Sequence, residues 1–349
     1  CLLSRGLGDV YKRQTRTSDL SRWIEIARPV DTIAERPLDP STDVVDILRK
    51  HECHIPARIV QPLLGPVPSL FHAEIDHILL TALALALASW RRSKARPDSP
   101  SVVALERHGR DATFGDADLS RTVGWFTAMH PVRLDVSGVD LDAALAGGPE
   151  IGVALKRVKE SLYGVPDGIG YGLLRHLNIQ TSTALARLGE PEIGFNYLGR
   201  FTASDGRPWG AVPETSGLGG GTDQGARVPH VLEINAWSED TADGPEMTAT
   251  WSWPEGVLSE GDVRCLMGAW SKALTAIVSY AENPEAGGRT PSDVPLIAID
   301  QAGLDWLEAT VPGKSDLLPL TPMQEGLLFH SLYDTCLLYT SPSPRDKRQ

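Results

Sequence analysis

The 349-residue chain predicts an α/β fold, because short apolar segments of strand character are interleaved with long helical ones. The strongest helix signal is Ile75–Arg92, where apolar residues recur at helical spacing and form one wide stripe. The clearest strand signals are Val231–Trp237 and Met247–Trp253, where apolar and polar residues alternate. These patterns indicate a layered domain in which the two alternating segments belong to one sheet.

The N-terminal part of the chain carries three further predicted elements. Apolar residues on one helical face predict a helix over Asp19–Ala27. Ile55–Leu64 has strand character but contains two prolines, which favours an edge strand or a crossover over a central strand. Ser101–Leu105 is a short apolar segment that predicts another strand.

The remaining segments continue the alternation of strands and helices. Strands are predicted at Val132–Val136 and Glu192–Tyr197, and Leu141–Tyr163 predicts a helix that a Gly-Gly-Pro sequence interrupts. Ser259 resembles a helix cap before Val263–Tyr280. Other expectations are a short helix at Ile169–His176, a glycine-rich loop at Ala203–Arg227, a linker at Gly287–Ser292 and a short closing segment at Leu296–Leu307.

Composition excludes several classes of partner. The net charge is -12 without a basic cluster, which argues against binding to nucleic acid or to an anionic membrane surface. The longest apolar run, Ile78–Trp90, is too short to span a bilayer and indicates a buried helix. Away from the chain ends the only cysteines are Cys53 and Cys265, which fits a reducing compartment, so we expect a cytoplasmic protein.

Both ends of the chain have the character of translated adaptor DNA. Ser4–Gln14 and Cys336–Asp346 can be encoded by DNA strings that are reverse complements over almost their whole length. This relation resembles one transposon-type sequencing adaptor read at both ends of a DNA fragment, so residues 1–14 and 336–349 are treated as an artefact. We expect the genuine sequence to lie between them, with limits set by DNA breakage.

Glu106 is the first candidate for acid/base chemistry. It follows an apolar strand directly, and strand ends commonly open into a cleft. A carboxylate held against a carbon acid in a water-excluded site can remove a proton from that carbon. The alternative interpretation is a simple ion pair of Glu106 with Arg107 or Arg110.

Other motifs have structural as well as functional interpretations. Asn196, near a strand end, is suited to bind a substrate carbonyl or enolate oxygen, or to cap its own turn. The adjacent Trp125 and Phe126 form a pocket wall or pack in the core. His51–His54 superficially resembles a metal site, but its residues are nearly contiguous, so a structural role is favoured. Gly168–Gly172 supplies backbone freedom at a helix start and lacks the lysine of a phosphate loop.

Five short sequences in a fixed order carry a resemblance to a known family. They are Asp76–Leu80, Glu106–Arg110, Arg121–Thr127, Pro166–Gly172 and Phe195–Gly199. No single one is decisive, but the five in register resemble the third to seventh motifs of the epimerization domain of nonribosomal peptide synthetases. The resemblance covers the chain from about residue 15 to residue 307.

The resemblance implies a fold and a reaction. The fold is similar to that of chloramphenicol acetyltransferase-like condensation domains, in which two α/β lobes enclose the active-site channel, and this chain corresponds mainly to the C-terminal lobe. The reaction is L-to-D inversion of an aminoacyl or peptidyl thioester, with Glu106 as the acid/base. The implied pocket residues are His108, Arg110, Trp125, Phe126, Tyr171, Asn196 and Tyr197.

The resemblance also implies partners. We expect no cofactor or metal bound directly, because the substrate is carried on the phosphopantetheine of an upstream peptidyl carrier domain. Leu318–His330 resembles the opening motif of a condensation domain, which predicts such a domain downstream. The family's paired-histidine motif, His-His-x-x-x-Asp, belongs to the N-terminal lobe and does not occur in this chain. The fragment alone is therefore predicted to be inactive.

Three positions depart from the family pattern. Arg107 stands where glycine is usual, Asp111 where glutamate is common, and His130 where tyrosine is frequent. Arg107 is expected to add bulk beside the proposed base.

The expected organisation leaves two alternative functions open. Residues 15–66 are assigned to a remnant of the N-terminal lobe, 67–307 to the C-terminal lobe, 308–317 to a linker and 318–335 to the first motif of a condensation domain.

The alternatives to epimerization are a condensation domain that forms peptide bonds and a non-catalytic interaction lobe. Arg121–Thr127 and Phe195–Gly199 argue against a condensation domain, because condensation domains resemble different sequence motifs at the corresponding positions.

Overall fold

The computed structural model describes residues 15–108, 121–124, 126–201, 223–311 and 317–333. The chain divides into two compact units, residues 1–288 and 289–349, which are described separately. The first unit contains the sheet and the candidate site.

A six-stranded mixed sheet organises the first unit, with the strand order β1-β6-β5-β4-β2-β3. Two consecutive pairs, β5–β4 and β4–β2, are parallel, and the other pairs are antiparallel. The strands are β1 (Leu48–Ile55), β2 (Ser101–His108), β3 (Thr127–Leu134), β4 (Ile193–Phe201), β5 (Leu232–Thr241) and β6 (Gly244–Pro254). The predicted strands near residues 101, 132, 192, 231 and 247 are thus confirmed.

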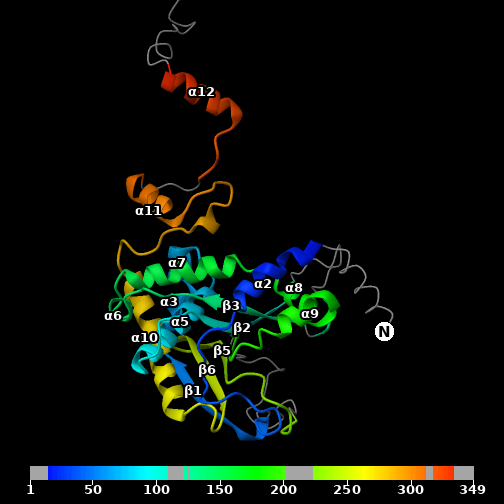
Figure 1. The fold of residues 1–349 in the computed structure, drawn as a ribbon. Helices are drawn as coiled ribbons and strands as arrows, with labels where there is room; N and C mark the ends of the chain where they lie inside the picture. Colours follow the sequence, from blue (N-terminus) through cyan, green and yellow to red (C-terminus); the bar gives the residue numbers. More distant parts are fainter. Residues whose placement is uncertain (1–14, 109–120, 125, 202–222, 312–316, 334–349) are drawn as a thin grey trace, which may run out of the picture. The chain divides into compact units, whose positions relative to one another are not determined.

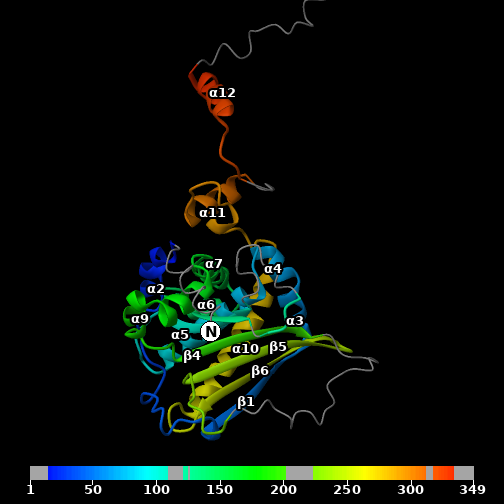
Figure 2. The ribbon, with the colours of Figure 1, turned by 90° about the vertical axis from the view of Figure 1, so that its right-hand side faces the viewer.

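The helices of the first unit gather mainly on one face of this sheet, as Figures 1 and 2 show. The long α5 and α10 pack against each other and against the sheet. The helices are α2 (Leu20–Ile26), α3 (Ala57–Leu64), α4 (Pro66–Phe71), α5 (Ile75–Ser93), α6 (Leu141–Leu145), α7 (Glu150–Tyr163), α8 (Gly168–Gly172), α9 (Ile179–Ala186) and α10 (Glu260–Ala281), with short 3-10 or π turns at Thr15–Asp19, Val45–Ile47 and Leu173–Leu177.

The main core lies between the sheet and α5 and α10. Trp251 on β6 and Trp270 on α10 are both fully buried, with their ring centroids 5.9 Å apart. At the start of α10, the Ser259 hydroxyl accepts a hydrogen bond from the Asp262 amide, as the sequence predicts. The Trp90 indole of α5 donates to the Asp262 carboxylate over 2.8 Å, which ties the two helices together.

A second, smaller cluster lies beside β3. Trp23 of α2 packs against Tyr171 of α8, with ring centroids 5.1 Å apart, and contacts the His130 ring edge-on. Asp167 caps α8 by accepting a hydrogen bond from the Ile169 amide. This cluster anchors the helix that the Gly168–Gly172 sequence begins.

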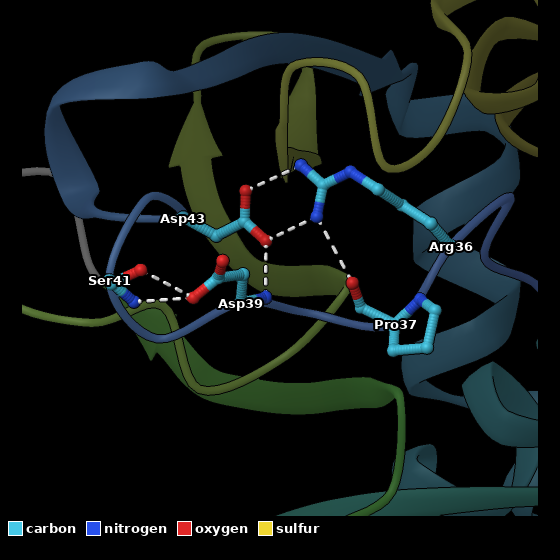
Figure 3. Close-up of polar contacts among 5 residues, drawn as sticks. All are labelled: Arg36, Pro37, Asp39, Ser41 and Asp43. Carbon is cyan, nitrogen blue, oxygen red and sulfur yellow. Dashed lines mark hydrogen bonds and ion pairs between the residues drawn. The ribbon is translucent and has the colours of Figure 1, made fainter.

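The segment before β1 is fixed by a buried carboxylate. Figure 3 shows Arg36 donating two hydrogen bonds to Asp43, both of 2.7 Å. Asp43 is 1% exposed and also accepts from the Asp39 amide, while Ser41 donates to Asp39. Hydrogen bonding to Arg36 lowers the pKa of Asp43. Because these groups satisfy one another, the cluster is a structural turn that leads into β1.

One predicted element is wrong. Ile55–Leu64 does not continue as a strand, because β1 ends at Ile55 and residues 57–64 form the helix α3 with Pro62 inside it. Ile59, Val60 and Leu63 make the buried helical face that stabilises α3 in spite of the proline. β1 pairs with β6, so residues on both sides of the expected boundary at residue 66 share one sheet. Most of the predicted loop at residues 203–227 lies outside the described residues.

The second unit contains α11 (Gln301–Thr310) and α12 (Pro322–Tyr333), preceded by a 3-10 turn at Pro291–Asp293. Asp300 caps α11 by accepting from the Gly303 amide. The large apolar side chains of α12 are exposed, among them Phe329, which stacks on Tyr333.

Within the described ranges, no single helix combines the length and apolar character needed to cross a bilayer. A bent pair, Ala57–Phe71 followed by Ile75–Ser93, meets that test only when its two parts are joined. Most of the apolar residues of this pair belong to the buried core.

Candidate functional site

The candidate site lies on the face of the sheet opposite the main core, here called the outer face. Strand alternation places Glu106 there, since its neighbour Leu105 belongs to the core. The strand register aligns five polar residues across this face, and we call them the polar row: Glu52, Thr250, Asn235, Asn196 and Glu106. Met129 of the edge strand β3 follows Glu106 in the same register.

Glu106 and Asn196 form the centre of the site. They come from parallel neighbours, β2 and β4, and are paired directly in the register. The Asn196 side-chain amide donates a hydrogen bond of 3.2 Å to Oε2 of Glu106, and both side chains are half-buried. This contact orients the carboxylate, and the hydrogen bond leaves Oε1 available for chemistry. This contact with the proposed acid/base group is neither of the two roles that the sequence suggested for Asn196, and substrate binding by its amide stays a prediction.

Arg107 does not share the face of Glu106. Alternation turns it toward the helices, where it contacts Oε2 of Glu74 at 2.6 Å and Oδ2 of Asp76 at 3.4 Å. The prediction that Arg107 adds bulk beside the proposed base is therefore wrong, because Arg107 lies on the other face of β2. The alternative ion pair of Glu106 with Arg107 is excluded by the same placement, and Arg110 lies outside the described residues.

Small residues form the floor beside the Glu106–Asn196 pair. Ala104 and Gly194 precede this pair by two residues on the outer face and are paired with each other. A Cβ at Gly194 would lie 2.5 Å from a carbon of the His230 ring. His230 is 4% exposed, and Nδ1 of its ring donates a hydrogen bond to the Pro191 carbonyl, so the ring cannot move aside readily.

Gly194→Ala should therefore lower the free energy of unfolding by about 1–3 kcal/mol through overpacking. Gly268→Ala is the matched control, because Gly268 lies within α10 with no heavy atom within 4 Å of its would-be Cβ. That substitution should stabilise the chain by about 0.5–1 kcal/mol through helix propensity. Urea unfolding measures the change in the free energy of unfolding for both variants, and equal changes would contradict the close packing at Gly194.

The other predicted pocket residues are not all brought to Glu106. Tyr197 points to the helix side, where its hydroxyl contacts Oγ of Ser238 at 3.0 Å and burial raises its pKa. Tyr171 lies in the cluster around Trp23, its hydroxyl accepts from Arg175, and burial raises its pKa. Phe126 is half-buried and its ring lies against Gly124.

Three further predicted residues have limited or no description. His108 ends β2, but its side chain lies outside what the structure describes. Trp125, like Arg110, lies outside the described residues. Their assignment to the pocket stays a prediction.

The His51–His54 sequence divides between the two faces of β1. His51 contacts Glu260 and Cys53 contacts Ser271 on the helix side, whereas His54 contacts Thr248. The side chains therefore do not converge. Among the residues that the structure describes, no group of three or more His, Cys, Asp or Glu is placed to hold a metal ion.

His130, where the family often has tyrosine, is buried under α8. It is 7% exposed, and a Cβ at Gly168 would overlap its ring. Its Nδ1 is buried without a hydrogen-bond partner. Burial, and secondarily the charge of Arg107, lowers the pKa of His130 from 6.5 to about 4.

Comparisons with known sequences relate the chain to peptide synthetases. The family model of the condensation domain matches residues 62–214. The chain is 34% identical to one of the linear gramicidin synthase proteins of Brevibacillus parabrevis over 311 residues, which are 88% of this chain and 4% of that protein. It is 35% identical to chondramide synthase of Chondromyces crocatus over 277 residues, which are 77% of this chain and 6% of that protein.

Comparisons with solved structures address the fold. The epimerization domain from the third module of tyrocidine synthetase B superposes with a TM-score of 0.60 and 28% identity, over 76% of this chain and 56% of that one. The X-domain from teicoplanin biosynthesis has a TM-score of 0.50 and 15% identity, over 81% and 59% of the two chains. The chain thus spans a small part of the curated relatives and just over half of these solved domains.

These comparisons confirm the predicted fold class, an α/β fold of the chloramphenicol acetyltransferase-like type. Residues 62–214 match the family model of the condensation domain, and the fold around them is similar to that of a solved epimerization domain.

Proposed function

We propose that the chain is the C-terminal portion of an epimerization domain of a nonribosomal peptide synthetase, followed by the start of a condensation domain. The epimerization domain would convert an L-aminoacyl or peptidyl thioester into its D form by removing and returning the α-proton. The observation that carries this proposal is the Glu106–Asn196 pair on the outer face of the sheet. The 28% identity to a solved epimerization domain supports it.

Glu106 is the group that moves the proton. A carboxylate oxygen takes the α-proton, the C–H electron pair shifts into the Cα–C bond, and the negative charge develops on the thioester oxygen as an enolate. The Asn196 amide holds Oε2, so the carboxylate keeps its orientation through the step. Reprotonation from the opposite side of the α-carbon completes the inversion, and the resemblance assigns that role to a histidine of the paired-histidine motif.

The substrate and partners follow from the same proposal. The thioester would be carried by the phosphopantetheine arm of an upstream peptidyl carrier domain, and the N-terminal lobe would close the channel over Glu106. Leu318–His330 would open a downstream condensation domain. Cys53 and Cys265 are free thiols, as is usual in the cytoplasm, where we place the reaction. Without the facing histidine, we expect the 349-residue chain alone to be inactive.

Peptide-bond formation is the second candidate function. It is favoured by the family model, which is that of the condensation domain. Arg121–Thr127 and Phe195–Gly199 favour epimerization instead, since these strings resemble epimerization motifs.

A carrier-loading assay with the complete domain separates the two candidates. One carrier domain is loaded with an L-aminoacyl group and incubated with the domain, and the released amino acid is analysed by chiral chromatography. Epimerization predicts a mixture of D and L forms on the single carrier. A dipeptide that forms only when a second loaded carrier is added, with no D product, would instead establish condensation.

A further inference from the structure

An apolar residue flanks Glu106 on the side away from Asn196. Met129 of β3 is paired with Glu106 in the strand register and is 49% exposed. The other strands contribute Asn235, Thr250 and Glu52 to the same register. Within the register that contains the polar row, the exposed apolar side chain of Met129 therefore lies next to the Glu106 carboxylate.

The arrangement constrains how a thioester can lie against Glu106. The carboxylate must face the α-carbon, which bears the thioester carbonyl, the nitrogen and the amino-acid side chain. Directly opposite residues on antiparallel strands have Cβ atoms about 4.5–5.5 Å apart, so a group bound at Glu106 is within reach of Met129. Asn196 already contacts the Glu106 carboxylate through its side-chain amide. The polar amide of Asn196 suits the carbonyl side. The amino-acid side chain is then directed toward Met129.

We propose that Met129 contacts the side chain of the amino acid being inverted and selects an apolar one. This inference rests on the proposed function and names the substrate class of the same site. Methionine is unbranched and polarisable, so it packs against apolar groups of differing shape. A charged or strongly polar substrate side chain would lose its hydration there without gaining a hydrogen bond.

The test compares an apolar, a small and an acidic substrate in the complete domain of the parent synthetase. Carriers are loaded with leucyl, alanyl or aspartyl groups, and the rate of α-deuterium incorporation from deuterium oxide is measured by mass spectrometry. The unaltered domain should exchange the leucyl thioester faster than the aspartyl one. Met129→Gln, which keeps the volume but adds an amide, should lower the leucyl-to-alanyl ratio of kcat/KM by about 10-fold or more.

Two variants make the result specific. Met129→Leu should retain the leucyl-to-alanyl ratio, because it keeps the apolar contact. Val153→Gln places the same amide on α7 at a residue that is 45% exposed, and it should leave both rates unchanged.

Two outcomes contradict the proposal, and a third contradicts the function on which it rests. An equal fall of the leucyl and alanyl rates in Met129→Gln would show that Met129 supports the fold or the opposite lobe, and would overturn the selection role. Leucyl and alanyl rates that both stay at the values of the unaltered domain would overturn it as well. Absence of exchange in the unaltered domain with every thioester would instead refute the proposed function itself.

Discussion

Glu106→Gln in the complete domain should lower the rate of α-proton exchange by about 100- to 10,000-fold, the usual contribution of a general acid–base group. Glutamine has the shape of glutamate, and its side-chain oxygen can still accept the hydrogen bond from Asn196. The change removes the basic carboxylate with little alteration of packing. Deuterium incorporation at the α-carbon of a carrier-bound thioester, followed by mass spectrometry, measures the loss.

Glu52→Gln is the matched control for this experiment. Glu52 occupies the same polar row on the same face, but it lies on the edge strand β1 at the other end of the row. The substitution removes the same charge without touching the proposed site, and exchange should continue at the original rate. Exchange by Glu106→Gln at the rate of the unaltered domain would show that another group removes the proton.

Acidification from about pH 6.5 to pH 4 should lower the free energy of unfolding by about 3 kcal/mol through His130 alone. Burial lowers its pKa to about 4 in the folded chain, against 6.5 as its ordinary value. Between these two pH values the unfolded chain binds the proton and the folded chain does not. The contribution of neutral His130 to the free energy of unfolding is therefore fully present above pH 6.5 and is lost as the pH falls through 4.

Urea unfolding of the 349-residue chain at a series of pH values measures this effect. His130→Phe should remove this part of the pH dependence, whatever its effect at neutral pH. His54→Phe is the control, since the His54 side chain is 71% exposed on β1. A pH dependence that is the same in His130→Phe and in the unaltered chain would refute the assignment.

The helices with strong periodicity or caps could be predicted from the sequence, and the weakly patterned ones could not. The apolar stripe of Ile75–Arg92 corresponds to α5, and the Ser259 cap begins α10. Ile55–Leu64 was ambiguous because the apolar residues at 55, 57 and 59 also fit the period of a strand. Burial of Ile59, Val60 and Leu63 on one face favours the helix over the strand, and this burial depends on the folded core. α9 has no strong pattern and was not predicted.

The site could be predicted as a set of residue types but not as an arrangement. Glu106 and Asn196 were each identified from short motifs, yet their contact depends on the parallel pairing of β2 with β4, which no local pattern specifies. The opposite orientation of Arg107 needed only the two-residue period of a strand, so that signal was present in the sequence. Met129 was missed because its position beside Glu106 follows from the register of β2 with β3.

The parallel pairing of β2 with β4 has a consequence for recombination between synthetase genes. The two halves of the proposed site are encoded 90 residues apart, and the pairing of two strands unites them. A gene junction between β2 and β4 can join halves from different parents if each strand keeps its length up to the site. Loss of one codon between Ile193 and Asn196 would rotate the asparagine to the helix face and misalign the partner of Glu106. Viable hybrids should therefore vary in the segments that join these strands and conserve the spacing within them.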